Sequence, residues 1–542
     1  MLSYRKLAMR VLGRPFHTGR IDSPRPASQR AAAFILTAAM LTTLAAPAFA
    51  DIWHIENGDI TISAGESGNN VTQNNNTTYG DTNTIITNQN KDTASSHTVT
   101  IEAKDKDDKV EVTLKDVNID TSSRNKAAVS VTGEGDTNIK LDGDNALKSD
   151  IYRSGIYGSG SGSLTISGGE NDSLTAQGGS GANGISSSGS LTISGGTVTA
   201  NGDDGGRGIS SSGSVTISGG STVTANGGSG TISGGDGIWS GGGVTISGGS
   251  TVTANGGNGG SLVGGDGIRS GGGLTVSDGT VTAKGGNGDS KDGYGGDGIR
   301  SGGVVTISGN TVNASGGYGG KVGGYGICSF DRVAISGGTV EAAGGNGSTG
   351  GGSGIYSSVI DLSGSLELTA KAGSPTGKAL LQNGRELDLD TIKDKLGPGA
   401  KVTATDANGE TKQVSIPRPV EPEEPVIPEE SSSSSDGGSA TPSAPVSPLP
   451  GLTVTDRDGQ RISYTSTQSG NTLTVCVGRL TASFRISLAA LRQLRAEGIE
   501  TITFQTILCS TTLSVDELLA MGGEDAEAVL THRFTDSSLT VG

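Results

Sequence analysis

Residues 208–236 read GISSSGSVTISGGSTVTANGGSGTISGGD, and variants of this stretch recur along the middle of the chain. A Gly-Ile pair opens each copy, and successive pairs lie 24–31 residues apart. The pairs are residues 155–156, 184–185, 208–209, 237–238, 267–268, 298–299, 326–327 and 354–355. A nearly constant period in this range is typical of a solenoid, in which each copy forms one coil.

Apolar and polar residues alternate inside each copy. Residues 215–217 are Val-Thr-Ile and residues 223–225 are Val-Thr-Ala, which is the pattern of a strand with one buried face. With a third strand at Ile209, the copy has three strands, and its glycines are expected at corners that require a positive φ. These strands are too short for any helix, so the repeats predict an all-β parallel β-helix.

Stacked coils place equivalent aliphatic residues in columns. One coil buries about five small aliphatic side chains, worth roughly 1.5–3 kcal/mol for each larger one. Ordering its backbone costs about 1–2 kcal/mol per residue, so only stacked coils are stable. A disordered spacer is the alternative, since the chain has 94 glycines and 3% aromatic residues. The strict apolar spacing argues against it. The first expected column is Ile185, Ile209, Ile238, Ile268, Ile299 and Ile327.

The charge of the chain excludes some partners. The 542 residues carry a formal net charge of −16, although the first 50 contain seven basic residues and one acid. An acidic chain of this kind is a poor ligand for nucleic acid or an anionic membrane.

Residues 1–50 have the features of an export signal. A basic lead is followed by the apolar run Ala31 to Leu44 and by Ala48-Phe49-Ala50, a small-x-small cleavage site. We expect cleavage after Ala50 and a secreted or cell-surface protein. The apolar run is too short and too alanine-rich for a membrane anchor, so no membrane insertion is expected after cleavage.

The remaining chain divides by composition. We expect an N-terminal cap and first coils over 51–150, the glycine-rich β-helix over 151–370 and a C-terminal cap over 371–416. A Pro/Glu/Ser-rich linker over 417–450 precedes a small α+β domain over 451–542. In that domain Cys476 and Cys509 either pair or are two small buried hydrophobes, whereas Cys328 is expected to be an unpaired residue of the solenoid.

Part of the sequence resembles a known family. The segments 51–55 (DIWHI), 112–120 (VTLKDVNID) and 138–145, followed by the Gly-Ile repeats, resemble secreted bacterial β-helix repeat proteins described as carbohydrate-binding-domain-containing proteins. The resemblance covers roughly residues 51–370. It implies a right-handed parallel β-helix, binding of acidic polysaccharide or a cell-surface glycan, and bound calcium. It implies no catalytic residues.

One outward row of the predicted helix carries the candidate site. It lies beside the Gly-Ile pairs and contains Ser186, Ser210 and Cys328 in addition to the candidate carbohydrate-binding residues, which are Tyr157, Trp239, Arg269, Arg300 and Tyr356. The candidate calcium ligands precede three of the pairs and are Asp236, Asp266 and Asp297. Tryptophan can stack on a sugar ring, arginine can pair with uronate carboxylates, and carboxylates stacked about 4.8 Å apart can bind Ca²⁺. Alternatively, the aspartates and arginines only neutralise each other.

Three classes of function remain open. The first is non-catalytic carbohydrate binding. The second is a structural spacer or adhesin that displays the C-terminal domain. The third is a polysaccharide lyase or hydrolase, which would use clustered carboxylates on one face. The uniform repeats argue against an enzyme, because a catalytic face usually interrupts the pattern, so we expect no catalysis.

Overall fold

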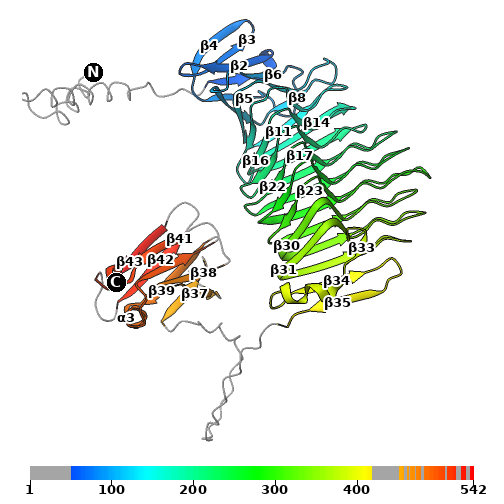
Figure 1. Cartoon of the computed structure of the whole chain (residues 1–542). Helices are drawn as coiled ribbons and strands as arrows, with labels where there is room; N and C mark the ends of the chain where they lie inside the picture. Colours follow the sequence, from blue (N-terminus) through cyan, green and yellow to red (C-terminus); the bar gives the residue numbers. More distant parts are fainter. Residues whose placement is uncertain are drawn as a thin grey trace, which may run out of the picture. The chain divides into compact units, whose positions relative to one another are not determined.

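The computed structural model describes residues 51–417 and, with short gaps, residues 451–541. The gaps are 457–459, 463, 470, 478–480, 507–509, 521–525 and 533–536. The expected export signal, most of the linker and Cys509 lie outside the described residues. The chain divides into two compact units, of which the first ends at Pro422 (Figure 1).

The first unit is a parallel β-solenoid of about 14 turns, which confirms the predicted fold class. Each central coil contributes one strand to each of three columns, and each of these strands pairs in parallel with its equivalent in the next coil. Residues Ile209, Val215 and Thr222 pair with Ile238, Val244 and Thr251. The Gly-Ile pairs therefore set the register of the whole stack.

The strands of each column follow one another along the chain. The first column contains β2 (Ile60–Gly65), β6 (Val99–Ala103), β9 (Val129–Gly133), β12 (Ile156–Gly158), β15 (Ile185–Ser187), β18 (Ile209–Ser211), β21 (Ile238–Ser240), β24 (Ile268–Ser270) and β27 (Ile299–Ser301). The second contains β1 (Ile52–His54), β5 (Thr84–Thr87), β7 (Lys109–Lys115), β10 (Asp136–Asp142), β13 (Leu164–Ser167), β16 (Leu191–Ser194), β19 (Val215–Ser218), β22 (Val244–Ile246), β25 (Leu274–Val276) and β28 (Val305–Ile307). The third contains β8 (Asn118–Asp120), β11 (Asp144–Lys148), β14 (Ser173–Ser180), β17 (Thr197–Asp203), β20 (Thr222–Asn226), β23 (Ser250–Asn255), β26 (Gly279–Lys284) and β29 (Thr311–Ser315). The long strands β30 (Ile327–Ala343) and β31 (Ile355–Lys371) run through all three.

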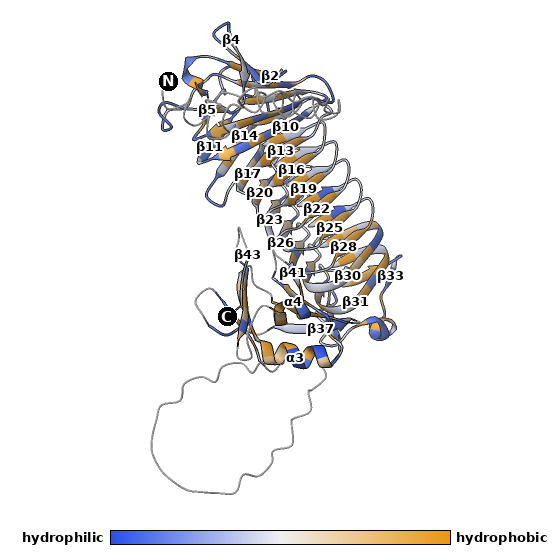
Figure 2. Cartoon of the chain, turned by 90° about the vertical axis from the view of Figure 1, so that its left-hand side faces the viewer, coloured by the Kyte–Doolittle hydropathy of each residue, from blue (hydrophilic) through white to orange (hydrophobic). Residues whose placement is uncertain are grey.

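Aliphatic columns fill the interior, as the alternation predicts. The isoleucines that open the first strands, Ile185 to Ile327, are completely buried. In the second strands, threonines such as Thr216 and Thr245 lie between two buried aliphatic residues and remain partly or fully exposed. In Figure 2 the hydrophobic residues recur at the same place on successive coils. The core is therefore one continuous stack shared between neighbouring coils.

A buried serine column accompanies the isoleucines, which the alternation alone does not reveal. Each hydroxyl donates a hydrogen bond of 2.8–3.2 Å to a carbonyl oxygen of the preceding coil. The serines of this column are Ser211, Ser240, Ser270, Ser301, Ser329 and Ser357. Since a polar group is costly to bury without a partner, this column helps to fix the spacing of the coils.

We expect Ser270→Ala to lower the free energy of unfolding by about 1 kcal/mol. Ser270 Oγ lies 3.0 Å from both the Gly242 and the Gly273 carbonyl oxygens, so the substitution removes the donor that joins two coils. Urea unfolding measures the loss. The exposed Ser261→Ala serves as the control and should change stability little. Equal losses in the two variants would show that the serine column adds nothing specific.

Two-stranded glycine arms project from the later coils between the third and first strands. In the arm of residues 256–265, the Gly265 N–H donates to the Gly257 carbonyl at 2.8 Å. The Gly257 N–H donates to the Gly235 carbonyl of the preceding arm, also at 2.8 Å. The arms therefore form one hydrogen-bonded array along the solenoid.

The reason for glycine in the arms differs from the sequence prediction. A Cβ at Gly265 would lie 1.9 Å from Gly235 O, and one at Gly256 would lie 1.9 Å from Gly265 O. Neither glycine has a positive φ, unlike the corner glycines Gly219 and Gly220, whose φ values are 67° and 70°. The corner prediction thus holds between the second and third strands, whereas the arms require glycine for close backbone packing.

Both ends of the solenoid depart from the parallel pattern. At the N-terminal end, β3 (Gly68–Gln73) and β4 (Asn76–Asp81) add antiparallel strands beside β2, after the short 3₁₀ helix η1 (Ile55–Asn57). At the other end, β32 (Leu380–Gln382) and β34 (Lys401–Thr405) still pair in parallel with β31. Residues 371–416 thus contain a last coil as well as a cap. The closing elements are β33 (Arg385–Glu386), η2 (Leu389–Lys395) and β35 (Thr411–Ser415).

In its described residues, the second unit contains two four-stranded sheets and two short helices. One sheet has β36 (Leu452–Thr455), β39 (Ala482–Ser487), β42 (Glu527–His532) and β43 (Ser537–Val541); the other has β37 (Thr465–Ser469), β38 (Thr472–Cys476), β40 (Thr501–Gln505) and β41 (Ser510–Ser514). The helices are α3 (Leu488–Ala496) and α4 (Val515–Ala520). The hydroxyl of Ser487 caps α3, and that of Ser514 accepts the Glu517 N–H at α4.

Cys476 is a half-buried and His532 a buried titratable residue of this unit. Cys476 is a free thiol, and its Sγ donates to Gln505 Oε1 at 3.5 Å. His532 is completely buried, and its Nε2 lies 2.9 Å from Thr511 Oγ1. Burial lowers the pKa of His532, so its imidazole is neutral at pH 7.

Among the helices of the described residues, none has the length and apolar character needed to span a membrane.

Candidate functional site

The first strand of each coil presents the predicted outward row. Strand pairing places Tyr157, Ser186, Ser210, Trp239, Arg269, Arg300, Cys328 and Tyr356 in one register, one per coil. Two of these positions do not belong to the outer surface, because Ser210 is only 7% exposed and Cys328 only 1% exposed. Cys328 is unpaired, as expected, and burial raises the pKa of its thiol to about 12. These two buried positions flank three consecutive coils, which carry Trp239, Arg269 and Arg300.

The three candidate aspartates form a column beside this row. Oδ1 of Asp236 accepts the N–H of Asp266 at 2.9 Å, and Oδ1 of Asp266 accepts the N–H of Asp297 at 2.7 Å. Oδ1 of Asp297 accepts the N–H of Tyr325, also at 2.7 Å. In the same position two coils earlier, Asn183 Oδ1 accepts the Arg207 N–H. Each side-chain oxygen thus binds the backbone of the next coil.

Arginines neutralise the two ends of the carboxylate column. Arg207 Nε lies 3.2 Å from Asp236 Oδ2, and Arg300 Nη1 lies 3.4 Å from Asp297 Oδ2. The Arg207 guanidinium also stacks 4.4 Å from the centroid of the Trp239 ring. The predicted mutual neutralisation is thus present, and Arg207 is a member of the site that the sequence-based prediction omitted. Arg269, between the two pairs, is exposed.

Burial changes the acidity of the column. It raises the pKa of Asp297 to about 6 despite the opposing effects of the Tyr325 N–H and of Arg300. It also raises the pKa of Asp266 well above the usual range, and the neighbouring Asp297 and Asp236 add to this effect. Desolvation and like charges both disfavour ionisation, so the column carries less negative charge than three exposed aspartates would.

A trough runs along the solenoid beside this column, where the returning strands of the arms meet the first strands. Its volume is about 540 Å³. Arg207, Asp236, Asp266, Arg269 and Arg300 line it together with bare glycine backbone, Asn183, Ser233 and Val263. Its lining residues come from successive coils, so the trough has the shape required for a chain-like ligand.

The structure separates the two predicted tyrosines from the trough. Tyr157 is in register with the row and 45% exposed, but Ser186 and Ser210 stand between it and Trp239. Tyr356 stacks on Tyr325 with ring centroids 5.0 Å apart and an interplanar angle of 15°. Neither these tyrosines nor Trp239 is among the residues that line the trough, so Arg269 and Arg300 are the predicted carbohydrate-binding residues that do.

The carboxylate oxygens of the aspartate column are poorly placed to bind calcium. Every Oδ1 atom already accepts a backbone N–H, and Oδ2 of Asp236 and Asp297 faces a guanidinium group. Calcium takes six to eight oxygen ligands, and a full ligand set is not assembled here. In the described part of the chain, no group of three or more His, Cys, Asp or Glu side chains is placed to hold a metal ion.

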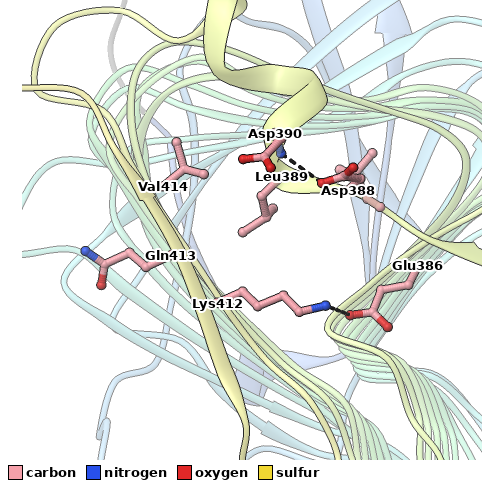
Figure 3. Close-up of a pocket in the computed structure, with 8 residues that line it drawn as sticks. Glu386, Asp388, Leu389, Asp390, Lys412, Gln413 and Val414 are labelled. Carbon is pink, nitrogen blue, oxygen red and sulfur yellow. Dashed lines mark hydrogen bonds and ion pairs between the residues drawn. The ribbon is translucent and has the colours of Figure 1, made fainter.

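A second hollow, of about 360 Å³, lies in the C-terminal cap (Figure 3). Lys412 Nζ and Glu386 Oε1 face each other across it at 3.5 Å, and the Asp388 carboxylate accepts the Asp390 N–H at 3.0 Å. The ammonium of Lys378 lowers the pKa of Glu386. These contacts close the end of the stack, and the hollow contains none of the predicted site residues.

The fold and the trough together define a repeat-built parallel β-solenoid with a charged lengthwise groove. Comparison with protein-family models, curated proteins and solved structures finds no match for this chain. The resemblance to carbohydrate-binding β-helix proteins therefore stays a prediction that rests on the sequence segments themselves.

Proposed function

We propose that this chain is an exported, non-catalytic β-solenoid that binds an acidic polysaccharide in the trough. The observation that carries the proposal is the pair Arg269 and Arg300, which stand in register on adjacent coils and both line the trough. A guanidinium group matches the geometry of a carboxylate and binds it through two parallel hydrogen bonds. Trp239 is in register with Arg269 next to the trough, and the ring face that Arg207 does not cover is proposed to contact a sugar ring.

The spacing of the coils supports a linear ligand. Neighbouring strands lie about 4.8 Å apart, which is close to the length of one sugar in an extended chain. A polysaccharide along the solenoid axis would therefore meet equivalent groups at each coil. The weakly ionised aspartates reduce the repulsion that three full charges would exert on the carboxylates of the ligand.

We expect Arg269→Ala to weaken binding of polygalacturonate by about tenfold or more, because one direct carboxylate partner is lost. The full chain would be titrated at fixed ionic strength, and the binding measured by the fluorescence of its two tryptophans, of which Trp239 lies next to Arg269 in the row. Arg332→Ala is the matched control, since Arg332 is exposed on β30 and does not line the trough. Equal weakening in both variants would indicate nonspecific attraction to cationic surface and would contradict the proposal.

A glycan array with the full chain separates the remaining classes of function. Retention of acidic glycans supports the proposal, and absence of any glycan binding supports the spacer or adhesin class. Release of new reducing ends from pectin would indicate a lyase or hydrolase. The predicted calcium requirement is tested by repeating the array with EDTA, and loss of binding on chelation would show that a metal takes part.

A further inference from the structure

The returning strands of the glycine arms carry a row of exposed apolar side chains. Val263 is 40% exposed and Tyr294 is 43% exposed, whereas the aliphatic columns of the coils are almost completely buried. Within residues 160–325, all of which the structure describes, every large exposed hydrophobic residue lies on an arm. Exposed apolar residues gathered on one feature commonly mark a binding surface.

This row is continuous with the trough. Val263 lines the trough together with Arg269 and Arg300. Backbone bridges join Ser233 to Val263, Val263 to Tyr294 and Tyr294 to Val322, so the four residues form one column with one member per coil. Val263 therefore stands on the arm side of the trough and the arginines stand on the coil side, while Tyr294 and Val322 continue the column of Val263 on the next two coils.

The backbone of this column is held rigidly. The Gly264 N–H donates to the Tyr294 carbonyl at 2.9 Å, and the Tyr294 N–H donates to the Leu262 carbonyl at 2.7 Å. The ammonium of Lys321, on the next arm, lies 5.7 Å from the centroid of the Tyr294 ring. A fixed aromatic face beside a cation suits a ligand that has an apolar face and an anionic edge.

We propose that Val263, Tyr294 and Val322 form the second wall of the trough, and that its ligand is a linear polyuronate with sugar rings against this wall and carboxylates toward Arg269 and Arg300. This inference rests on the proposed function and goes further, because it requires a ring as well as a charge at each coil. A polyanion without rings would use only the arginine wall. The apolar wall therefore predicts selectivity for polyuronates over other polyanions.

The test compares polygalacturonate with poly-L-glutamate, which has a carboxylate on every residue but no sugar rings. The full chain is expected to prefer polygalacturonate, and Tyr294→Ala to weaken that binding about tenfold without changing the binding of polyglutamate. Tyr294→Phe should retain the affinity. Tyr318→Ala is the matched control, because Tyr318 is 48% exposed but belongs to the outgoing strand of its arm, in the column of Asn258 and Asn287.

The outcomes separate this inference from the proposed function. Equal affinity of the wild-type chain for both polymers, or a Tyr294→Ala variant that binds polygalacturonate as the wild type does, would overturn the second wall and leave the arginine site intact. Absence of polygalacturonate binding by the wild-type chain would overturn the proposed function itself. Thermal unfolding of each variant shows that a loss of affinity does not come from a loss of fold.

Discussion

Gly265→Ala is expected to cost the solenoid roughly 3 kcal/mol or more of unfolding free energy. The new Cβ would lie 1.9 Å from the carbonyl oxygen of Gly235 in the preceding coil. That oxygen already accepts the Gly257 N–H at 2.8 Å, so it cannot retreat without breaking the array of arms. Urea unfolding followed by tryptophan fluorescence measures the loss. Both tryptophans of the chain, Trp53 and Trp239, precede the linker and therefore report on the solenoid alone.

Gly220→Ala is the matched control for this substitution. Gly220 has a φ of 70°, and a Cβ there would meet nothing within 4 Å. Alanine at this corner is strained only by its backbone conformation, which costs about 1–2 kcal/mol. The Gly265 variant should therefore lose clearly more stability than the Gly220 variant. Similar losses would mean that the arms tolerate a side chain and are not closely packed.

The sequence predicts the coils well and the arms badly, for a physical reason. Ile268 and Val276 are fixed by alternation within a few residues, and such local patterns identify a buried face. The glycines of the arms are required by contacts with the preceding coil, about one repeat away, as Gly265 and Gly235 illustrate. A single copy carries no sign of that contact, so the arms resemble ordinary glycine-rich loops in the sequence.

The same division applies to the candidate site: the sequence predicts the residues on the coils but not those on the arms. Arg269, Arg300 and the three aspartates follow from the register of the Gly-Ile pairs. The structure places both arginines, Asp236 and Asp266 along the trough, and Asp297 continues the aspartate column beside it. Arg207 immediately precedes Gly208, in the position that Asp236 occupies one coil later, so the repeat alignment contained its signal. Tyr294 had no such signal, because the arms differ in length and only the bridges between them show that it follows Val263.

The solenoid is expected to lose stability as the pH rises from about 4 to 7, because of Asp297. Its pKa is 3.8 when free and about 6 in the folded chain. Between these values the folded state binds more protons than the unfolded state, so the free energy of unfolding falls as the pH rises. The difference between the two pKa values corresponds to roughly 3 kcal/mol of unfolding free energy. This contribution is fully present below pH 3.8 and is lost once the pH exceeds about 6. Asp266 acts in the same direction, since burial raises its pKa as well.

Asp297→Asn should remove the part of this dependence that comes from Asp297. Asparagine keeps an oxygen for the Tyr325 N–H but never ionises, and Arg300, whose side chain is 38% exposed, can turn to water. Relative to the wild-type chain, the variant is therefore expected to gain roughly 2 kcal/mol between pH 4.5 and pH 8, because the free carboxyl is already largely ionised at pH 4.5. Urea titrations at both pH values, followed by tryptophan fluorescence, measure the difference. The exposed Asp289→Asn should follow the wild-type profile. If Asp297→Asn also follows it, the carboxylate column is hydrated and ionised like an ordinary surface, and the reduced repulsion assumed for the trough is wrong.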